Sequence, residues 1–522
     1  MFMIKPRISF RRLRGGSSSE FRNLSPRDSE GDSENSNEEI NRAGRHHVSI
    51  EICEDGSSTT LINNKRKKRK PSRNSDKALS DSIGGKVKLT PPRSSECCIY
   101  RVPKALRETK ERAYVPEIVS IGPFHRGNRN LQAMDEYKRL YLHDLLSHLP
   151  TQAKMLESWI KTLRGLEVKA RKCYSEPVDN LSSDEFVEMM LVDGCFVLEL
   201  LRKYSEIQLK GGPPEPVHSG VLGAAQDQAA DDKAQPQDPI FKSAWMLPRI
   251  LCDMLLLENQ LPLFVLECLF KLTIAPQLQQ ALSLNELVFN FFANIMPTGG
   301  ESPADRPRLI KGQHILSLLR KAILPSSKLK FPGDIKAPEL THCVTELIEA
   351  GIKFKKKEKP DSFLDISFST DGVLEIPSIN VQEYTDCLFR NLIAFEQCHP
   401  SCTSRITSYA FLMDSLVDTP EDVQYLNRRS IITHVMGTHK EVSLLFNKLC
   451  DGVYLNHFYY VDLCDQVNAH FRSRWHVWRA TLMRDYFKNP WAVLSFVAAI
   501  FLLILTFTGS LFSILSFSIH NS

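Results

Sequence analysis

The chain has 522 residues, 42% of them apolar and 24% charged, a composition that excludes a protein disordered throughout its length. Its net charge of +5 is unevenly divided: residues 1–95 hold 20 Lys and Arg against 12 Asp and Glu, so the rest of the chain stands at −3. That balance excludes the global basic footprint of a nucleic-acid-binding fold.

The first 96 residues form a tail that we predict to be disordered. They are rich in Ser, Asn, Arg and Glu and poor in aromatic residues, so they lack the apolar surface needed to offset the entropy of an ordered chain. A basic run lies within this tail, at Lys65, Arg66, Lys67, Lys68, Arg69 and Lys70. Three interpretations stay open: a nuclear import signal, a contact with anionic lipid on the cytosolic leaflet, and a solvated run of charge without a partner.

From residue 97 to residue 488 the sequence predicts one helical domain. Apolar residues recur at helical spacing in three segments, which marks one buried face in each. These are Met155, Trp159, Ile160 and Leu163; Val381, Tyr384, Leu388, Leu392 and Phe395; and Val442, Leu445, Phe446 and Leu449. Thr419 and Pro420, followed by two acidic residues, are typical of a helix start, because the hydroxyl caps the first turn and the acids face the helix dipole. The expected fold class is therefore mainly α.

Strand signals are sparse in this domain. Residues 364–369 and 373–379 flank the tripeptide Thr-Asp-Gly, which predicts one small β-hairpin with a glycine turn. Residues 208–239 and 297–308 are rich in Pro, Gly, Ala and Asp and predict surface loops, the first of them of low complexity. The hairpin is thus a small addition to a helical domain.

The most apolar part of the domain is residues 255–270. Pro262 interrupts it, and Glu258, Asn259 and Gln260 in its middle would be costly in lipid. We therefore predict two packed helical pieces here rather than a membrane span.

Several acidic residues lie within apolar runs and are predicted to be buried. A buried charge must be paired or hydrogen-bonded, so Arg390 and Asn259 are candidate partners. The candidate buried polar network consists of Asp193, Glu258, Asn259, Arg390, Glu396 and Asp414. Two interpretations stay open: a network that locks helices together, and an acid–base site with shifted pKa values. The first is favoured, because no nucleophile or substrate clamp is adjacent in the sequence.

The usual catalytic motifs are absent from the sequence, namely GxSxG, GxxxxGK[ST], GxGxxG after a strand and HExxH. Cys398, His399 and Cys402 lie close together with Cys387 nearby, but a second matched pair of ligands is missing, so we predict no metal site. His125, in GPFHRG, is a candidate general base if a carboxylate meets it in space; the alternative is a turn histidine bonded to backbone. We assign no catalytic residue and expect no cofactor.

Residues 490–517 are predicted to form a transmembrane helix. The stretch from Trp491 to Phe517 has 27 residues without a charge, whereas about 20 apolar residues span a bilayer core. Arg484 and Lys488 precede it and no Lys or Arg follows, so the positive-inside rule places the body in the cytosol, with Trp491 at the interface. Thirteen cysteines without a secretory signal agree with a reducing compartment. We expect a tail-anchored, single-pass membrane protein of the plasma membrane or an endomembrane.

Eight segments of the chain occur in an order that resembles a known family. They are IYRVP (99–103), VPEIVSIGPFHRG (115–127), DEYKRLYL (135–142), VDGCFVLELL (192–201), DPIF (238–241), LLLENQLPLFVLE (255–267), FRNLIAFEQC (389–398) and SYAFLMDSLVDTPEDV (408–423). Together they resemble the plant family called domain of unknown function 247, of the uncharacterised protein family 0481 type. The resemblance implies a plant origin, a mainly helical body and one C-terminal membrane helix.

The same resemblance implies binding rather than turnover. The family has no accepted enzymatic activity or catalytic residues, and some members are associated with self-incompatibility recognition in grasses. This chain departs from the family pattern in its long basic N-terminal extension and in the low-complexity insertion before Asp238, and both are places where different partners would bind.

We therefore expect a non-enzymatic, membrane-tethered recognition or signalling protein. Its cytosolic body would bind a protein partner, and its C-terminal helix would bind membrane lipid. One alternative is a membrane-bound enzyme of unrecognised type that uses the embedded acids or His125. Another is a nuclear regulator released by proteolysis near Lys488, for which the basic run is the only support. Nucleic acid is not an expected partner of the folded part, because its charge balance is negative.

Overall fold

The computed structural model describes residues 73–89, 96–147, 152–209, 238–273, 282–297, 310–325, 342–472 and 490–520. Several predictions fall outside these described residues: those for the basic run at 65–70, for nearly all of the two loops, and for Arg484 and Lys488. They stay predictions.

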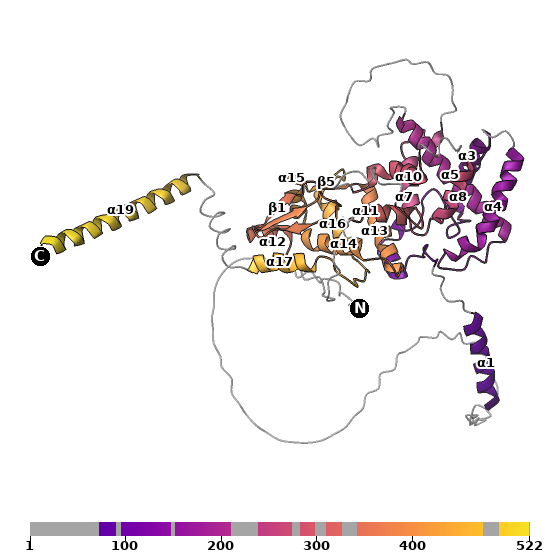
Figure 1. Cartoon of the computed structure of the whole chain (residues 1–522), viewed down its shortest axis with the longest axis horizontal. Helices are drawn as coiled ribbons and strands as arrows, with labels where there is room; N and C mark the ends of the chain where they lie inside the picture. Colours follow the sequence, from indigo (N-terminus) through magenta and orange to yellow (C-terminus); the bar gives the residue numbers. More distant parts are fainter. Residues whose placement is uncertain are drawn as a thin grey trace, which may run out of the picture. The chain divides into compact units, whose positions relative to one another are not determined.

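The body is mainly helical, as predicted, and its N-terminal part is built around the long helix α5 (Ser183–Leu209) (Figure 1). Sixteen of the 27 residues of α5 are buried. Four helices pack around it: α3 (Ala133–Ser147), α4 (Gln152–Lys172), α8 (Leu263–Thr273) and α10 (Leu284–Phe292). A helix that is apolar on most of its sides is stable in water only as such a central element.

The C-terminal part of the body is arranged around α13 (Glu383–Cys398). This helix packs against α7 (Met246–Leu255), α11 (Ile315–Ile323), α14 (Arg405–Leu416) and α16 (His439–Leu449). Further helices of the body are α2 (Lys104–Arg107), α6 (Pro239–Lys242), α12 (Val344–Glu349), α15 (Pro420–Arg428) and α17 (Val461–Arg472), with 3-10 turns at Glu111–Ala113, Arg129–Leu131 and Ala293–Ile295.

Two of the sequence patterns can be checked at single residues. The predicted start of α15 is confirmed, because the Thr419 hydroxyl accepts the Asp422 N–H and the Asp422 carboxylate accepts the Thr419 N–H at 2.8 Å. The periodic pattern that began at Val381 started two residues too early. Val381 belongs to a strand, and α13 begins only at Glu383.

Two small sheets lie in the described part of the body. The predicted hairpin is formed by β2 (Ser367–Phe368) and β3 (Val373–Ile376), which are antiparallel. Its turn contains Gly372, whose φ of +75° is the conformation that glycine adopts without strain. β1 (Lys353–Lys356) was not predicted; it pairs in parallel with β3 and gives the strand order β1-β3-β2.

The second sheet is formed by β4 (Ile379–Val381) and β5 (Ile432–His434), which are parallel. Because these strands frame α13 and α15 in the sequence, the sheet joins the two ends of that helical segment. Neither strand was predicted from the sequence.

The C-terminal segment is the helix α19 (Pro490–His520), at the position predicted for a transmembrane helix. The window Leu494–Leu511 has a mean hydropathy of 2.3, and none of it is buried. Within the described residues this is the one helix long and apolar enough to cross a membrane.

The helix α1 (Arg73–Leu89) forms part of a unit separate from the body. It lies inside residues 1–96, which we predicted to be a disordered tail, and it is the part of that tail for which the structure describes a helix. The segment carries good helix formers such as Lys77, Ala78 and Leu79, with Asp76 facing the dipole of the first turn.

Candidate functional site

Three polar residues cross the middle of the body between α7 and α8, where Pro262 was predicted to interrupt the apolar stretch. Glu258, Asn259 and Gln260 are 1%, 1% and 2% exposed. We call residues 256–262 the core polar segment. Because a non-helical backbone inside a core leaves N–H and C=O groups without helical partners, polar side chains must satisfy them.

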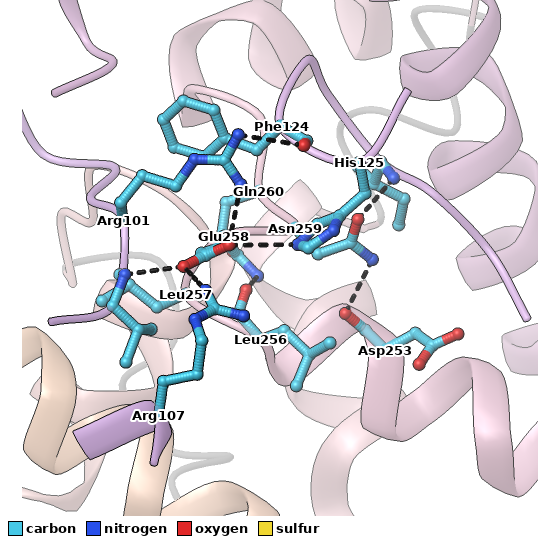
Figure 2. A network of polar contacts seen from close by, with 12 residues as sticks. Arg101, Arg107, Phe124, His125, Asp253, Leu256, Leu257, Glu258, Asn259 and Gln260 are labelled. Atoms are coloured by element: carbon cyan, nitrogen blue, oxygen red, sulfur yellow. Dashed lines mark hydrogen bonds and ion pairs between the residues drawn. The ribbon is translucent and has the colours of Figure 1, made fainter. Parts of the chain in front are cut away.

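The carboxylate of Glu258 is the charged centre of this segment (Figure 2). Arg101 Nη1 donates to its Oε2 at 3.0 Å, while Arg107 and the N–H of Val102 both donate to Oε1. His125 Nε2 lies 3.3 Å from Oε2. The Arg101 and Arg107 side chains are 37% and 25% exposed, so a fully buried anion is joined to two cations that reach the solvent.

These contacts keep the Glu258 carboxyl ionised. Burial raises its pKa, because charge is costly away from water. The His125 side chain, the Val102 N–H and the Arg107 guanidinium outweigh burial and hold the pKa at about 2. A carboxylate in this state is neither a proton donor nor a strong base at neutral pH.

Asn259 and Asp253 fasten a second segment, residues 117–122. Asn259 Nδ2 donates to the Val119 carbonyl at 2.9 Å, and its Oδ1 accepts the Ile121 N–H at 2.6 Å. The Asp253 carboxylate, on α7, accepts the N–H groups of residues 117, 118 and 119 at 2.8–2.9 Å. Burial raises the pKa of Asp253 to about 6, and the three N–H donors oppose that rise.

Gln260 and Gly122 show how closely the two segments approach. Gln260 Nε2 donates to the Met254 and Leu256 carbonyls at 2.7 and 2.9 Å. The backbone carbonyl of Gln260 accepts a hydrogen bond from the Tyr174 hydroxyl. Gly122 has φ +79°, and a Cβ placed there would lie 2.8 Å from the Gln260 carbonyl oxygen. Only glycine meets both conditions without strain.

Asp193, on α5, holds residues 117–122 from another side. Its Oδ2 accepts the Gly122 N–H at 2.8 Å, and its Oδ1 accepts Lys138 Nζ, from α3, at 2.7 Å. Lys138 also donates to the Ser120 carbonyl at 2.5 Å. The Lys138 and Asp193 side chains are 5% and 4% exposed, so this ion pair is buried.

A hollow of about 270 Å³ opens beside this ion pair. Lys138, Asp193 and His125 line it, together with exposed side chains of both signs that include Arg126 and Glu188. The condition set for His125 in the sequence is met, because Glu258 approaches its ring. A histidine beside a carboxylate and a hollow is one part of an acid–base site. The described lining contributes no Cys or Thr, and its one Ser, Ser120, is buried.

The other members of the predicted network lie elsewhere. Arg390 is paired with Asp386 at 2.9 Å and donates to the Lys448 carbonyl, and these bonds connect it to none of the predicted acids. Glu396 binds Arg320 in a second buried ion pair, with a shortest N–O distance of 2.6 Å. Asp414 is half-buried on α14. The structure thus brings Asp193, Glu258 and Asn259 together around residues 117–125.

Sequence reasoning missed five charged partners: Arg101, Arg107, Lys138, Asp253 and Arg320. Arg101 and Lys138 lie inside the segments IYRVP and DEYKRLYL, so a basic residue within an apolar motif was the available signal. Asp253 lies within an apolar run, between Cys252 and Met254, and had the same signal as the acids that were found.

Two of the cysteines near His399, Cys398 and Cys387, donate to backbone carbonyls. Cys398 Sγ donates to the Arg101 carbonyl at 3.9 Å, and Cys387 Sγ to the Cys252 carbonyl at 3.7 Å. Among the residues that the structure describes, no group of three or more His, Cys, Asp or Glu is placed to hold a metal ion.

Comparisons with known proteins agree on one relationship. A family model described as plant protein of unknown function, DUF247, matches residues 99–505. The chain is similar to UPF0481 protein At3g47200 of Arabidopsis thaliana, at 30% identity over 445 residues that cover 81% of this chain and 87% of that protein. It is also similar to Putative UPF0481 protein At3g02645 of Arabidopsis thaliana, at 23% identity over 504 residues, with 78% and 88% covered. No solved structure matches the chain.

Proposed function

The chain belongs to the plant family DUF247, whose function is unknown, and from this premise we propose that it is a membrane-tethered, non-enzymatic recognition protein. In this proposal α19 holds the chain in a membrane, and the helical body binds a protein partner at the cytosolic face. The observation that carries it is α19 itself, with 18 consecutive residues of mean hydropathy 2.3 that the body does not cover.

The chemistry of the core polar segment supports the non-enzymatic part. The oxygens of Glu258, Asp193 and Asp253 are occupied by donors from the chain itself. A group with this many fixed partners serves packing better than proton transfer, because any transfer would break bonds that hold residues 117–122. Tethering supports recognition, because it raises the effective concentration of the body toward other membrane proteins.

Protease protection on intact membranes tests the tether and its orientation. The full chain carries a tag at each end, and a chain truncated after Lys488 is the control. We expect digestion of the N-terminal tag, protection of the C-terminal tag and release of the truncated chain from the membrane. Protection of the body, or a glycan on Asn180 in its Asn-Leu-Ser sequon, would indicate the reversed orientation. Either result would contradict a cytosolic partner.

Photo-crosslinking in the same membranes tests recognition. A photoreactive residue replaces Trp245, which is 62% exposed, in one chain. In a second chain it replaces Val168, which is 68% exposed and so matches Trp245 in exposure. We expect a discrete adduct from the anchored chain, and from a chimera in which another uncharged helix of equal length replaces α19. The adduct should weaken strongly in the truncated chain. Adducts that are absent, or equal with and without an anchor, would contradict the proposal.

An acid–base enzyme is the second candidate, and the hollow beside His125 is the observation that favours it. A His125→Gln variant separates the two candidates. The recognition proposal expects this variant to keep the crosslinked adduct. A turnover activity of the wild type that disappears in a folded His125→Gln chain would favour the enzyme instead.

A further inference from the structure

The surface around β1 carries a concentration of positive charge. β1 has the sequence KFKK, with Phe354 buried and its three lysines exposed. A hollow of about 530 Å³ beside it is lined by Lys355, Lys356, Lys357 and Arg429 against only two acids, Glu358 and Glu375. We define the basic edge surface as Lys353, Lys355, Lys356 and Arg429.

The cations of the basic edge surface outnumber the acids near them, Glu358 and Glu375, of which Glu375 lies opposite Lys355 in the β1–β3 pair. Lys353, Lys355, Lys356 and Arg429 form no ion pair with a described residue, whereas Lys357 next to them is paired with Asp365 at 2.9 Å. Unpaired cations on one surface attract a partner with clustered negative charge. β1 is also an edge strand, because β3 is its single neighbour in the order β1-β3-β2.

The sheet lies where the body ends and the chain continues toward α19. β2, in the same sheet, packs against α17. The rings of Phe368 and His470 meet edge to face, with their centroids 5.6 Å apart. α17 ends at Arg472, and α19 begins at Pro490. The chain between them spans at most about 60 Å even when fully extended. The basic edge surface is therefore on the part of the body from which the tether departs.

We propose that the basic edge surface lies against the anionic lipid headgroups of the leaflet that holds α19. This inference rests on the proposed function, because it requires α19 in a membrane and the body on the cytosolic side, where the leaflet is anionic. The contact would fix one orientation of the body, leaving the surface away from β1 free for a protein partner. Lysines also keep edge strands from pairing with other chains, a role that needs no lipid.

Lysine acylation of the full wild-type chain in vesicles tests this directly. The chain is reconstituted into phosphatidylcholine vesicles with or without about 30% phosphatidylserine, and a soluble amine reagent is followed at each lysine by mass spectrometry. Lys161 and Lys172 serve as internal controls, because they are exposed on α4, which packs against α3, α5 and α8 and is far from β1 in the body (Figure 1).

We expect acylation of Lys355 and Lys356 to slow by about threefold or more with phosphatidylserine, and to recover near 0.5 M salt, where charges are screened within a few ångströms. Lys161 and Lys172 should change less than twofold. Equal rates in the two vesicle types would overturn the inference. Equal protection by inorganic phosphate in neutral vesicles would also overturn it, in favour of a soluble anion.

A flotation step separates this inference from the function on which it rests. A chain that does not float with vesicles fails the tether proposal. A chain that floats in both vesicle types, with unprotected Lys355 and Lys356, fails only the lipid contact. A Lys355→Glu/Lys356→Glu chain should float as well as the wild type, and the remaining Lys353 should lose its protection by phosphatidylserine; retained protection at Lys353 would contradict the proposal.

Discussion

Charge is used in opposite ways in the core polar segment and at the basic edge surface. Glu258 is fully buried, and its oxygens have donors from three different residues of the chain. Lys355 and Lys356 are exposed and have no ion pair with a described residue. A charge taken out of water must be compensated within the fold, whereas an exposed charge costs little and stays available to a partner.

The two regions should therefore respond differently to substitution. Removing a charge from the core should damage folding first, since its buried partners are left uncompensated. Removing a charge from the edge should leave folding nearly unchanged and alter only external contacts. The quantity that distinguishes the two regions is the free energy of unfolding of the full chain, measured by urea denaturation in one non-ionic detergent.

Asp193→Asn should have the largest effect, about 4 kcal/mol, because it removes the buried anion of Lys138 and leaves only the exposed Asp135, at 3.6 Å, near this buried cation. The amide keeps the shape of the side chain and an acceptor for the Gly122 N–H. The control is the double variant Lys138→Met/Asp193→Asn, which removes both charges and should lose clearly less than Asp193→Asn alone. A single variant as stable as the wild type would contradict the structural role of this pair.

Glu258→Gln should cost about 3 kcal/mol at pH 7, somewhat less than the first variant. The reason for the smaller loss is that Arg101 and Arg107 are partly exposed and can be hydrated when their anion is removed. A Glu176→Gln variant is the matched control, because it removes the other carboxylate that binds Arg101, at 3.2 Å on the surface. Equal losses from the two variants would contradict the contrast between buried and exposed charge.

The Glu258 contribution should also depend on pH in a defined direction. Its pKa in the fold is about 2, below the ordinary 4.5, so the carboxylate stabilises the fold above about pH 4.5 and loses that effect as the pH falls toward 2. The difference between wild type and Glu258→Gln should therefore shrink from about 3 kcal/mol at pH 6 to about 1.5 kcal/mol at pH 3. A difference that is constant over this range would show that the ionised form is not the one being stabilised.

Gly122→Ala should cost about 2 kcal/mol, because the left-handed backbone strains a side chain and the new Cβ would meet the Gln260 carbonyl oxygen at 2.8 Å. Gly127→Ala is the matched control, since Gly127 has a similar φ of +84° but a Cβ added there would meet no atom within 4 Å. The difference between the two variants isolates the close approach from the backbone strain. No difference would mean that the core polar segment can shift away.

The sequence predicted local features, such as helices and buried acids, better than it predicted which side chains pair with those acids. The helical spacing of Val442, Leu445 and Phe446 and the break at Pro262 are visible locally, and both match the structure. The prediction of two helical pieces in residues 255–270 was wrong for the first piece, because α7 ends at Leu255 and residues 256–262 are not helical. The acids Asp193 and Glu258 were found because they stand out in apolar runs. Their partners were not found, because Arg101 is 157 residues from Glu258 and spacing reports contact only within one helix.

The strand β1 was missed for a related reason. Lysine-rich KFKK has little intrinsic strand preference, and its strand form follows from pairing with β3 twenty residues later. The basic edge surface is likewise a product of tertiary structure, because Arg429 reaches it from the end of α15. Only Lys353–Lys356 is contiguous in the sequence, and a run of that length is ordinary on a protein surface.

Lys355→Gln/Lys356→Gln should have the smallest effect on the free energy of unfolding, within about 0.5 kcal/mol, because exposed side chains without ion pairs contribute little to stability. Lys357→Gln, one residue further, is the matched control: it breaks a partly exposed ion pair with Asp365 and should cost up to about 1 kcal/mol. If the double variant lost more stability than Lys357→Gln, the lysines of β1 would contribute to the stability of the body. The contrast between compensated charge in the core and available charge at the basic edge surface would then be wrong for that surface.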